Sequence, residues 1–113
     1  MTRTVFTGAQ VFDARTATAG PADLVMEGDR IAEVGSGLDG DESVDVSGRT
    51  LLPGLFDCHT HVVLSHIDLW KLLQQPFSYR FYDAAKNLRA TLETGITTVR
   101  DAGGADLGTK KAL

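Results

Sequence analysis

The stretch 51–62, LLPGLFDCHTHV, constrains the fold more than any other part of the chain. After the Pro-Gly pair, the residues from Leu55 onward predict a β-strand, in which side chains alternate between two faces. Asp57, His59 and His61 then share one face, whereas the other face is apolar or small. Two such imidazoles lie about 6.6 Å apart along the strand, and both can bind one cation through Zn–N bonds of about 2.1 Å. The motif therefore predicts half of a metal site on a buried strand.

A His-x-His pair has other interpretations. Two histidines with this spacing also occur on solvent-exposed strands that bind nothing, because exposed polar residues are common. A cupin-type site uses the same pair but needs a glutamate three or four positions later, where this chain has Leu64 and Ser65. The cupin interpretation is therefore rejected.

Composition and charge exclude several functional classes. Of the 113 residues, 42% are hydrophobic and 23% are charged, and the formal net charge is −4. This balance is typical of a globular protein and provides no basic surface for nucleic acid. No apolar run approaches the roughly 18 residues of a membrane helix, and the N-terminus lacks the apolar segment of a secretory signal. We therefore expect a cytoplasmic protein with no membrane or nucleic-acid partner.

Cysteine usage adds one expectation. Cys58 is the single cysteine, so an internal disulfide is excluded. Its side chain is predicted to point away from the histidine face and to be a small buried hydrophobe.

The first half of the chain predicts a small β domain. Its β-branched and aromatic runs predict four or five short antiparallel strands, at residues 4–13, 23–27, 30–34, 43–46 and 50–52. Gly8 marks a bulge or bend, and Gly28-Asp29 fits a two-residue hairpin turn. Small and helix-breaking residues predict loops at 16–22 and 35–41.

The second half predicts one right-handed βαβ unit. After a short helical piece over 67–75, the apolar stripe Phe81, Ala85, Leu88 and Leu92 predicts a helix over 78–94. Gly95 suits the position that follows a helix C-terminus. Residues 96–101 then predict a second strand, and a further helix is expected from residue 107.

Two runs resemble one known family. PGLFDCHTH at 53–61 resembles the signature of the amidohydrolase superfamily, in which the histidines end the first barrel strand. GITTVRDAGG at 95–104 resembles the second barrel strand of members of the prolidase and imidazolonepropionase type. The resemblance implies an α/β fold: residues 1–53 form part of a small β-sandwich domain, and residues 54–113 form the first βαβ unit of a (β/α)8 TIM barrel. Because such a barrel needs about 250 residues, this chain is expected to be an N-terminal portion, inactive alone.

The resemblance also implies a metal centre. His59 and His61 would bind one divalent ion, for which zinc is the expected metal given imidazole ligands. The other ligands and the general base would come from later strands, so the complete enzyme would hold one or two ions and use metal-activated water. Apart from the candidate Asp101, no catalytic residue is identified in this chain.

Four further residues have open roles near the predicted site. Asp57 either supports a ligand imidazole or is a buried acid satisfied by backbone or water. Asp101 either touches substrate or steadies a neighbour, or else caps a helix or pairs with Arg100. His66 and Trp70 lie in the first βα loop, where they either line a substrate pocket or are a solvated histidine and a packing tryptophan.

Two classes of function follow from these expectations. The first is hydrolysis of a C–N bond in a small molecule, with Xaa-Pro dipeptides as the leading substrate and an imidazolone-type cyclic amide as the alternative. The second is a non-catalytic truncated or remnant chain, or one component of a barrel that another chain completes. Unpaired strand edges predict that the chain forms a homo-oligomer or associates with other chains.

Overall fold

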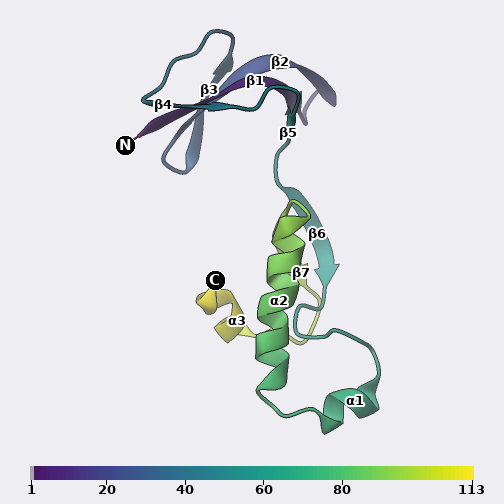
Figure 1. Cartoon of the computed structure of the whole chain (residues 1–113). Coiled ribbons are helices and arrows are strands. Elements are labelled where there is room, and N and C mark those ends of the chain that lie inside the picture. The colour runs from purple at the N-terminus through teal and green to yellow at the C-terminus, as the bar shows by residue number, and fades with distance from the viewer. Residues whose placement is uncertain (1) are drawn as a thin grey trace. The chain divides into compact units, whose positions relative to one another are not determined.

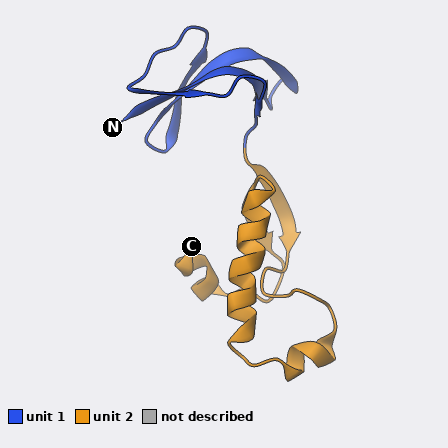
Figure 2. Cartoon of the chain, viewed as in Figure 1, with its two compact units in different colours: residues 1–53 blue, residues 54–113 orange. Residues whose placement is uncertain are grey.

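A computed structural model describes residues 2–113 of the chain (Figure 1). The chain divides into two compact units, Met1–Pro53 and Gly54–Leu113 (Figure 2). Each unit is described by itself below.

Unit 1 is a five-stranded sheet. Its strands lie in the order β3-β2-β1-β4, with β5 also paired to β1. Their bounds are β1 Arg3–Asp13, β2 Thr18–Glu27, β3 Arg30–Gly35, β4 Glu42–Asp45 and β5 Thr50–Leu51. The buried core of the sheet consists of Val5, Ala9 and Val25.

Two local predictions for unit 1 are confirmed. The register of β1 against β2 shifts between Phe6 and Ala9, which places a bulge at Gly8. Strands β2 and β3 pair as a hairpin with Glu27 opposite Arg30, so Gly28 and Asp29 form the turn. Both features depend on short-range turn chemistry, which the residue types specify directly.

Two other predictions for unit 1 are wrong. The strands are not all antiparallel, because β4 and β5 run parallel to β1. The loop between β3 and β4 carries the chain to the far edge of the sheet, so the direction of β4 depends on this crossover and not on local sequence. Residues 18–22 are strand and not loop, because the long β1 supplies partners as far as the pair Asp13 and Thr18.

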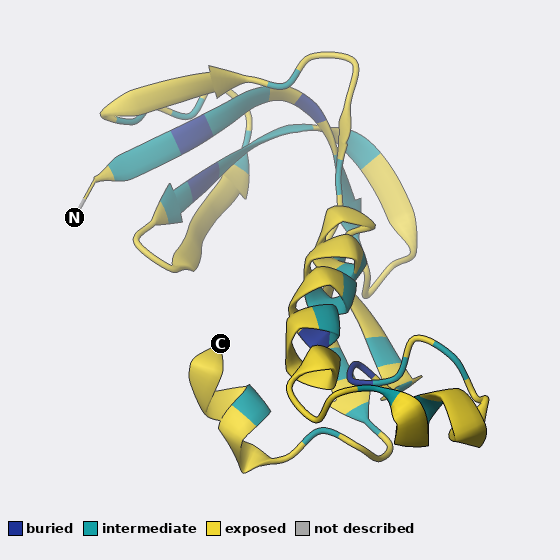
Figure 3. Ribbon diagram, turned by 60° about the horizontal axis from the view of Figure 1, so that its bottom comes forward, coloured by how far each residue is buried: buried dark blue, intermediate teal, exposed yellow. Residues whose placement is uncertain are grey.

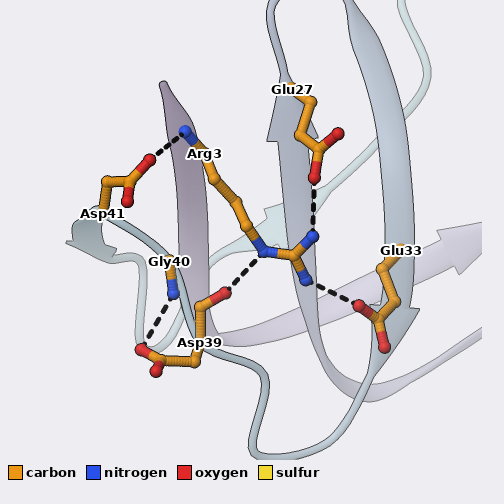
Figure 4. A network of polar contacts seen from close by, with 6 residues as sticks. All are labelled: Arg3, Glu27, Glu33, Asp39, Gly40 and Asp41. Atoms are coloured by element: carbon orange, nitrogen blue, oxygen red, sulfur yellow. Dashed lines mark hydrogen bonds and ion pairs between the residues drawn. The ribbon is translucent and has the colours of Figure 1, made fainter. Parts of the chain in front are cut away.

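The charged residue Arg3 connects several parts of unit 1 (Figure 4). Its guanidinium forms ion pairs of 2.7 Å with Glu27 and with Glu33, on β2 and β3. Its Nε donates to the carbonyl of Asp39 at 2.9 Å, and its main-chain N–H donates to Asp41 at 2.8 Å. The hydrogen bond to Glu33, followed by that to Glu27, raises the pKa of the guanidinium above its usual value. The side chain thus uses its planar set of donors to join β1, β2, β3 and the following loop.

Unit 2 contains the predicted βαβ unit. Strands β6 (Leu55–Thr60) and β7 (Ile96–Asp101) are parallel and are connected through helix α2 (Tyr79–Glu93). Short helices α1 (Leu69–Gln74) and α3 (Leu107–Ala112) precede and follow this unit. Gly95 follows α2 with φ 88° and donates to the carbonyl of Leu92 at 2.9 Å, as expected for a helix end.

The buried face of α2 differs from the predicted stripe. The core of unit 2 consists of Val62, Val63 and Ala84, with Leu88 packed against it. Phe81 is 43% exposed and Leu92 is 61% exposed. Of the predicted stripe, Leu88 alone packs against the core and Ala85 is exposed, whereas Ala84, next to the stripe, is buried against Val62 and Val63.

Most residues of β6 are exposed, including Phe56 and Cys58 on the face opposite His59 (Figure 3 colours each residue by its burial). Phe56 is 72% exposed, and the Cys58 thiol is free and exposed. The prediction that Cys58 is a buried hydrophobe is therefore wrong for residues 2–113, which leave this face of the strand uncovered. Among these residues there is also no helix long and apolar enough to cross a membrane.

Candidate metal centre

Strand β6 positions the two histidines. The strand ends at Thr60, so His59 lies at its carboxyl end and His61 follows the strand directly. The two rings are edge-to-face, with centroids 5.3 Å apart and planes at 73°. Two imidazoles that bind one tetrahedral ion through Zn–N bonds of about 2.1 Å have ring centroids about 5 Å apart. The observed separation therefore fits a shared metal ion.

The ring of His61 has a defined hydrogen-bond partner. Its Nδ1 lies 2.7 Å from the carbonyl oxygen of Gly103, in the loop after β7. Because a carbonyl can only accept, this contact requires the proton on Nδ1. Nε2 then keeps its lone pair, which is the arrangement that a metal-binding imidazole needs.

The carboxylate of Asp101 binds three main-chain amides. Oδ2 accepts from Val62 at 2.8 Å, and Oδ1 accepts from Gly103 at 2.8 Å and from Ala105 at 3.3 Å. Burial raises the pKa of this carboxyl, but the three hydrogen bonds, with a smaller effect of nearby His61, outweigh it. The pKa of Asp101 is therefore lowered from its usual value. Asp101 connects the residue after His61 to the Gly103 loop.

The expected alternatives for Asp101 are not observed. The N-cap of α3 is Asp106, which accepts from the amide of Thr109. No ion pair joins Asp101 to Arg100 in the part of the chain that the structure describes. Asp101 instead accepts from main-chain amides that form no hydrogen bond between β6 and β7. The residue type alone does not indicate this role.

The turn after His61 is held against α2 by polar side chains that sequence reasoning missed. Asn87 donates to the carbonyl of Val62 at 2.9 Å and to the hydroxyl of Ser65 at 3.2 Å. Ser65 in turn donates to Asp83. These contacts join residues more than 15 positions apart, so no local pattern signals them.

The remaining candidate residues lie around this core. Asp57 is half-buried and accepts from the main-chain N–H of His59 at 3.0 Å, so its observed contact is with backbone and not with an imidazole. Trp70 on α1 is 76% exposed, contrary to the packing interpretation. His66 is half-buried, and its Nδ1 has no hydrogen-bond partner among the described residues.

The structure therefore brings some candidates together and not others. The rings of His59 and His61 contact each other, and Asp101 accepts from the amide of Val62, the residue after His61. Within residues 2–113, no hydrogen bond or ring contact links His66 or Trp70 to these three residues. Within the same range, no group of three or more His, Cys, Asp or Glu side chains is arranged to hold a metal ion. The two imidazoles thus form a pair and not a complete set of ligands.

Comparison with known proteins places the chain in a family. The model of the Amidohydrolase family matches residues 50–113, more than half of the chain. An adenine deaminase of Brucella anthropi is 35% identical over 63 residues, which cover 56% of this chain and 11% of that protein. An imidazolonepropionase of Paenarthrobacter aurescens is 47% identical over 47 residues, covering 39% and 12%.

A solved structure extends the similarity to almost the whole chain. A prolidase crystallised with N-methylphosphonate-L-proline is 36% identical, with a TM-score of 0.87. The match covers 97% of this chain and 28% of the prolidase chain. The chain thus spans about a quarter of that structure and about a ninth of the curated relatives. It belongs to the amidohydrolase family, and its α/β fold corresponds to the small β-sandwich and first βαβ unit that begin the (β/α)8-barrel enzymes of that family.

Proposed function

We propose that this chain provides the His59–His61 half of a divalent metal centre in an enzyme that hydrolyses C–N bonds. The observation that carries the proposal is the 5.3 Å separation of the two rings, together with the contact of His61 Nδ1 to Gly103, which leaves Nε2 free. Membership of the amidohydrolase family supports the same chemistry. The expected metal is zinc, because neutral imidazoles are among its preferred ligands.

The proposal assigns a domain to each unit. Residues 1–53 are part of a β-sandwich domain, and residues 54–113 are the first βαβ unit of the barrel. The boundary between the compact units at Pro53 and Gly54 supports this assignment. The two histidines then lie at the carboxyl end of a barrel strand, where TIM-barrel active sites are built.

The division of chemical roles follows from the donors present. A bound divalent ion supplies Lewis acidity and lowers the pKa of its water toward neutrality. His59 and His61 would hold that ion, and Asp57 restrains the main chain that carries His59 by accepting its N–H. The other ligands and the base that accepts the water proton must come from outside the pair, since residues 2–113 hold no larger ligand cluster.

The leading substrates are dipeptides with C-terminal proline. Support comes from the prolidase similarity, which covers 97% of this chain at 36% identity. A cyclic amide of the imidazolone type is the second candidate, supported by the 47% identity to an imidazolonepropionase over a shorter stretch. A non-catalytic role, alone or as one component of a barrel completed by another chain, remains the alternative from a different functional class.

A chimeric enzyme tests the proposal. The segment of the prolidase that matches this chain is replaced by residues 1–113, and metal content and Xaa-Pro dipeptide hydrolysis are measured. His59→Ala is expected to remove bound metal and activity. Cys58→Ser, on the opposite, exposed face of the same strand, is the matched control and should retain both. Undiminished metal content in the His59→Ala chimera would show that the ligand assignment is wrong.

A further inference from the structure

The Gly103 carbonyl that contacts His61 belongs to a loop organised by one carboxylate. Asp101 Oδ2 accepts from the amide of Val62, the residue directly after His61, at 2.8 Å. Its Oδ1 accepts from the amides of Gly103 at 2.8 Å and Ala105 at 3.3 Å. The Asp101 carboxylate thus joins two stretches of main chain. One follows His61, and the other carries the Gly103 carbonyl oxygen that accepts the Nδ1 proton of His61.

Other contacts reduce the freedom of this loop. The amide of Ala102 donates to the carbonyl of Thr60 at 2.8 Å, directly before His61. Gly104 has φ 111°, and a Cβ placed there would lie 2.6 Å from a methyl carbon of Val63. Only glycine adopts this conformation readily and also tolerates so close a neighbour. The direction of the Gly103 carbonyl is therefore determined by its surroundings.

The loop selects one form of the His61 ring. A neutral imidazole has a single N–H, which either nitrogen can carry. With the Gly103 oxygen 2.7 Å from Nδ1, the form with the proton on Nδ1 gains a hydrogen bond. The form with the proton on Nε2 would instead place two lone pairs against each other. The ring of His59 has no corresponding hydrogen bond among the described residues, so the selection is specific to His61.

We propose that Asp101 is a positioning residue for His61. Its carboxylate holds the Gly103 carbonyl against Nδ1 and so keeps Nε2 as the unprotonated nitrogen available to a metal ion. The use of Nε2 as a ligand rests on the proposed function, whereas the choice of tautomer needs no metal. Asp101 acts through the loop and does not itself contact the ion.

The tautomer is measured in the prolidase chimera described above, with its metal removed by a chelator, because the isolated 113-residue chain is expected to be only partly ordered around His61. Nitrogen chemical shifts of ¹⁵N-labelled histidines are recorded at a pH of about 8, where an imidazole is neutral. His61 is expected to carry its proton on Nδ1. Asp101→Asn keeps the size of the side chain but replaces one acceptor oxygen by a donor, and it should shift His61 toward the Nε2-protonated form.

The matched control changes a similar carboxylate beside the other histidine. Asp57 also accepts a main-chain N–H, that of His59. Asp57→Asn is therefore expected to leave the His61 tautomer unchanged. A second variant, Gly104→Ala, keeps the Asp101 carboxylate but displaces the loop, and it should alter His61 in the same direction as Asp101→Asn.

Three results would overturn the proposal. The first is a wild-type His61 that carries its proton on Nε2. The second is a tautomer that changes in Gly104→Ala but not in Asp101→Asn, because the loop would then act without the carboxylate. The third is an equal change in the Asp57→Asn control.

A zinc titration of the same samples separates this proposal from the proposed function. Removal of a hydrogen-bond partner that orients a ligand typically weakens metal affinity by about 10-fold or more, so Asp101→Asn should bind zinc about 10-fold more weakly than wild type. If the chimera without further substitution binds no zinc while the tautomer results hold, the metal assignment fails and the role of Asp101 in selecting the tautomer is supported. Unchanged zinc affinity in an Asp101→Asn variant with an altered tautomer would refute the positioning role.

Discussion

At the scale of single residues, unit 1 also uses a carboxylate to bind main-chain amides that the sheet leaves free. Asp23 on β2 accepts from Gly8 at 3.2 Å, in the bulge of β1. It also accepts from Gly37 at 2.8 Å and Leu38 at 3.3 Å, in the loop after β3. One side chain therefore holds a bulge and a crossover loop in place, as Asp101 does beside the histidines of unit 2.

These hydrogen bonds predict a pH dependence of stability. The bonds from Gly8 and then Leu38 lower the pKa of Asp23 from its ordinary value of 3.8; burial opposes them with a smaller effect, and the bond from Gly37 lowers the pKa further. Because the folded-state pKa is below the unfolded one, the stabilisation is complete above the unfolded value and is lost as the pH falls through the folded value. Asp23→Asn should therefore reduce the free energy of unfolding at pH 7 but progressively less below pH 3.8.

Urea unfolding of wild type and Asp23→Asn across this pH range measures the effect. A probe in unit 1, such as amide exchange at Val25, reports on the sheet that Asp23 supports. A difference between the two proteins that stays constant from neutral to acidic pH would contradict the assignment, because an uncharged role of Asp23 would not titrate.

At the scale of elements, the start of β6 passes unusually close to β7. A Cβ at Gly54 would lie 2.6 Å from the Cγ2 and 2.8 Å from the Cβ of Thr97. The two parallel strands therefore need a glycine at this point for steric reasons. The pairing of β6 with β7 begins directly after this contact, with Leu55 opposite Ile96, and ends with Thr60 opposite Asp101.

Gly54→Ala is expected to destabilise unit 2. Overpacking of this kind typically costs about 1–3 kcal/mol. The matched control is Gly20→Ala in β2, where an added Cβ meets nothing within 4 Å. Amide hydrogen exchange should accelerate through β6 and β7 in Gly54→Ala and remain near wild type in Gly20→Ala. Equal exchange rates in both variants would rule out the steric explanation.

At the scale of the whole molecule, both units leave large apolar side chains exposed. In unit 1, Ile31 is 62% and Leu52 is 59% exposed, and both line a hollow of about 430 Å³. In unit 2, Trp70 is 76% and Leu73 is 78% exposed. Within the described residues β7 pairs only with β6, so its outer edge is free. Exposed apolar surface and free strand edges both favour association.

The isolated 113-residue chain is therefore expected to self-associate, or to be only partly ordered beyond Pro53. Parallel strand pairs are normally covered on both faces, which β6 and β7 are not. Analytical sedimentation measures the association, and amide hydrogen exchange measures the order. A compact monomer with slow exchange throughout residues 55–101 would show that the chain satisfies these surfaces by itself.

Several features were determined by the sequence alone. The strand that carries His59 and leads to His61, the bulge at Gly8 and the termination of α2 before Gly95 all follow from short-range chemistry. Alternation along a strand and the φ angles open to glycine depend on residue type and neighbours only. For this reason the histidine pair and the βαβ unit could be predicted from residue types and their spacing.

Other features were decided only by the tertiary structure. The parallel direction of β4, the extension of β2 to Thr18 and the burial of Ala84 in place of Phe81 all depend on partners distant in the sequence. The same is true of Asp101, whose role comes from amides in the two segments that follow β6 and β7. Local patterns specify which elements form. Contacts between residues distant in the sequence determine how strands pair and which side chains bind the main chain. Such contacts also orient the His61 ring.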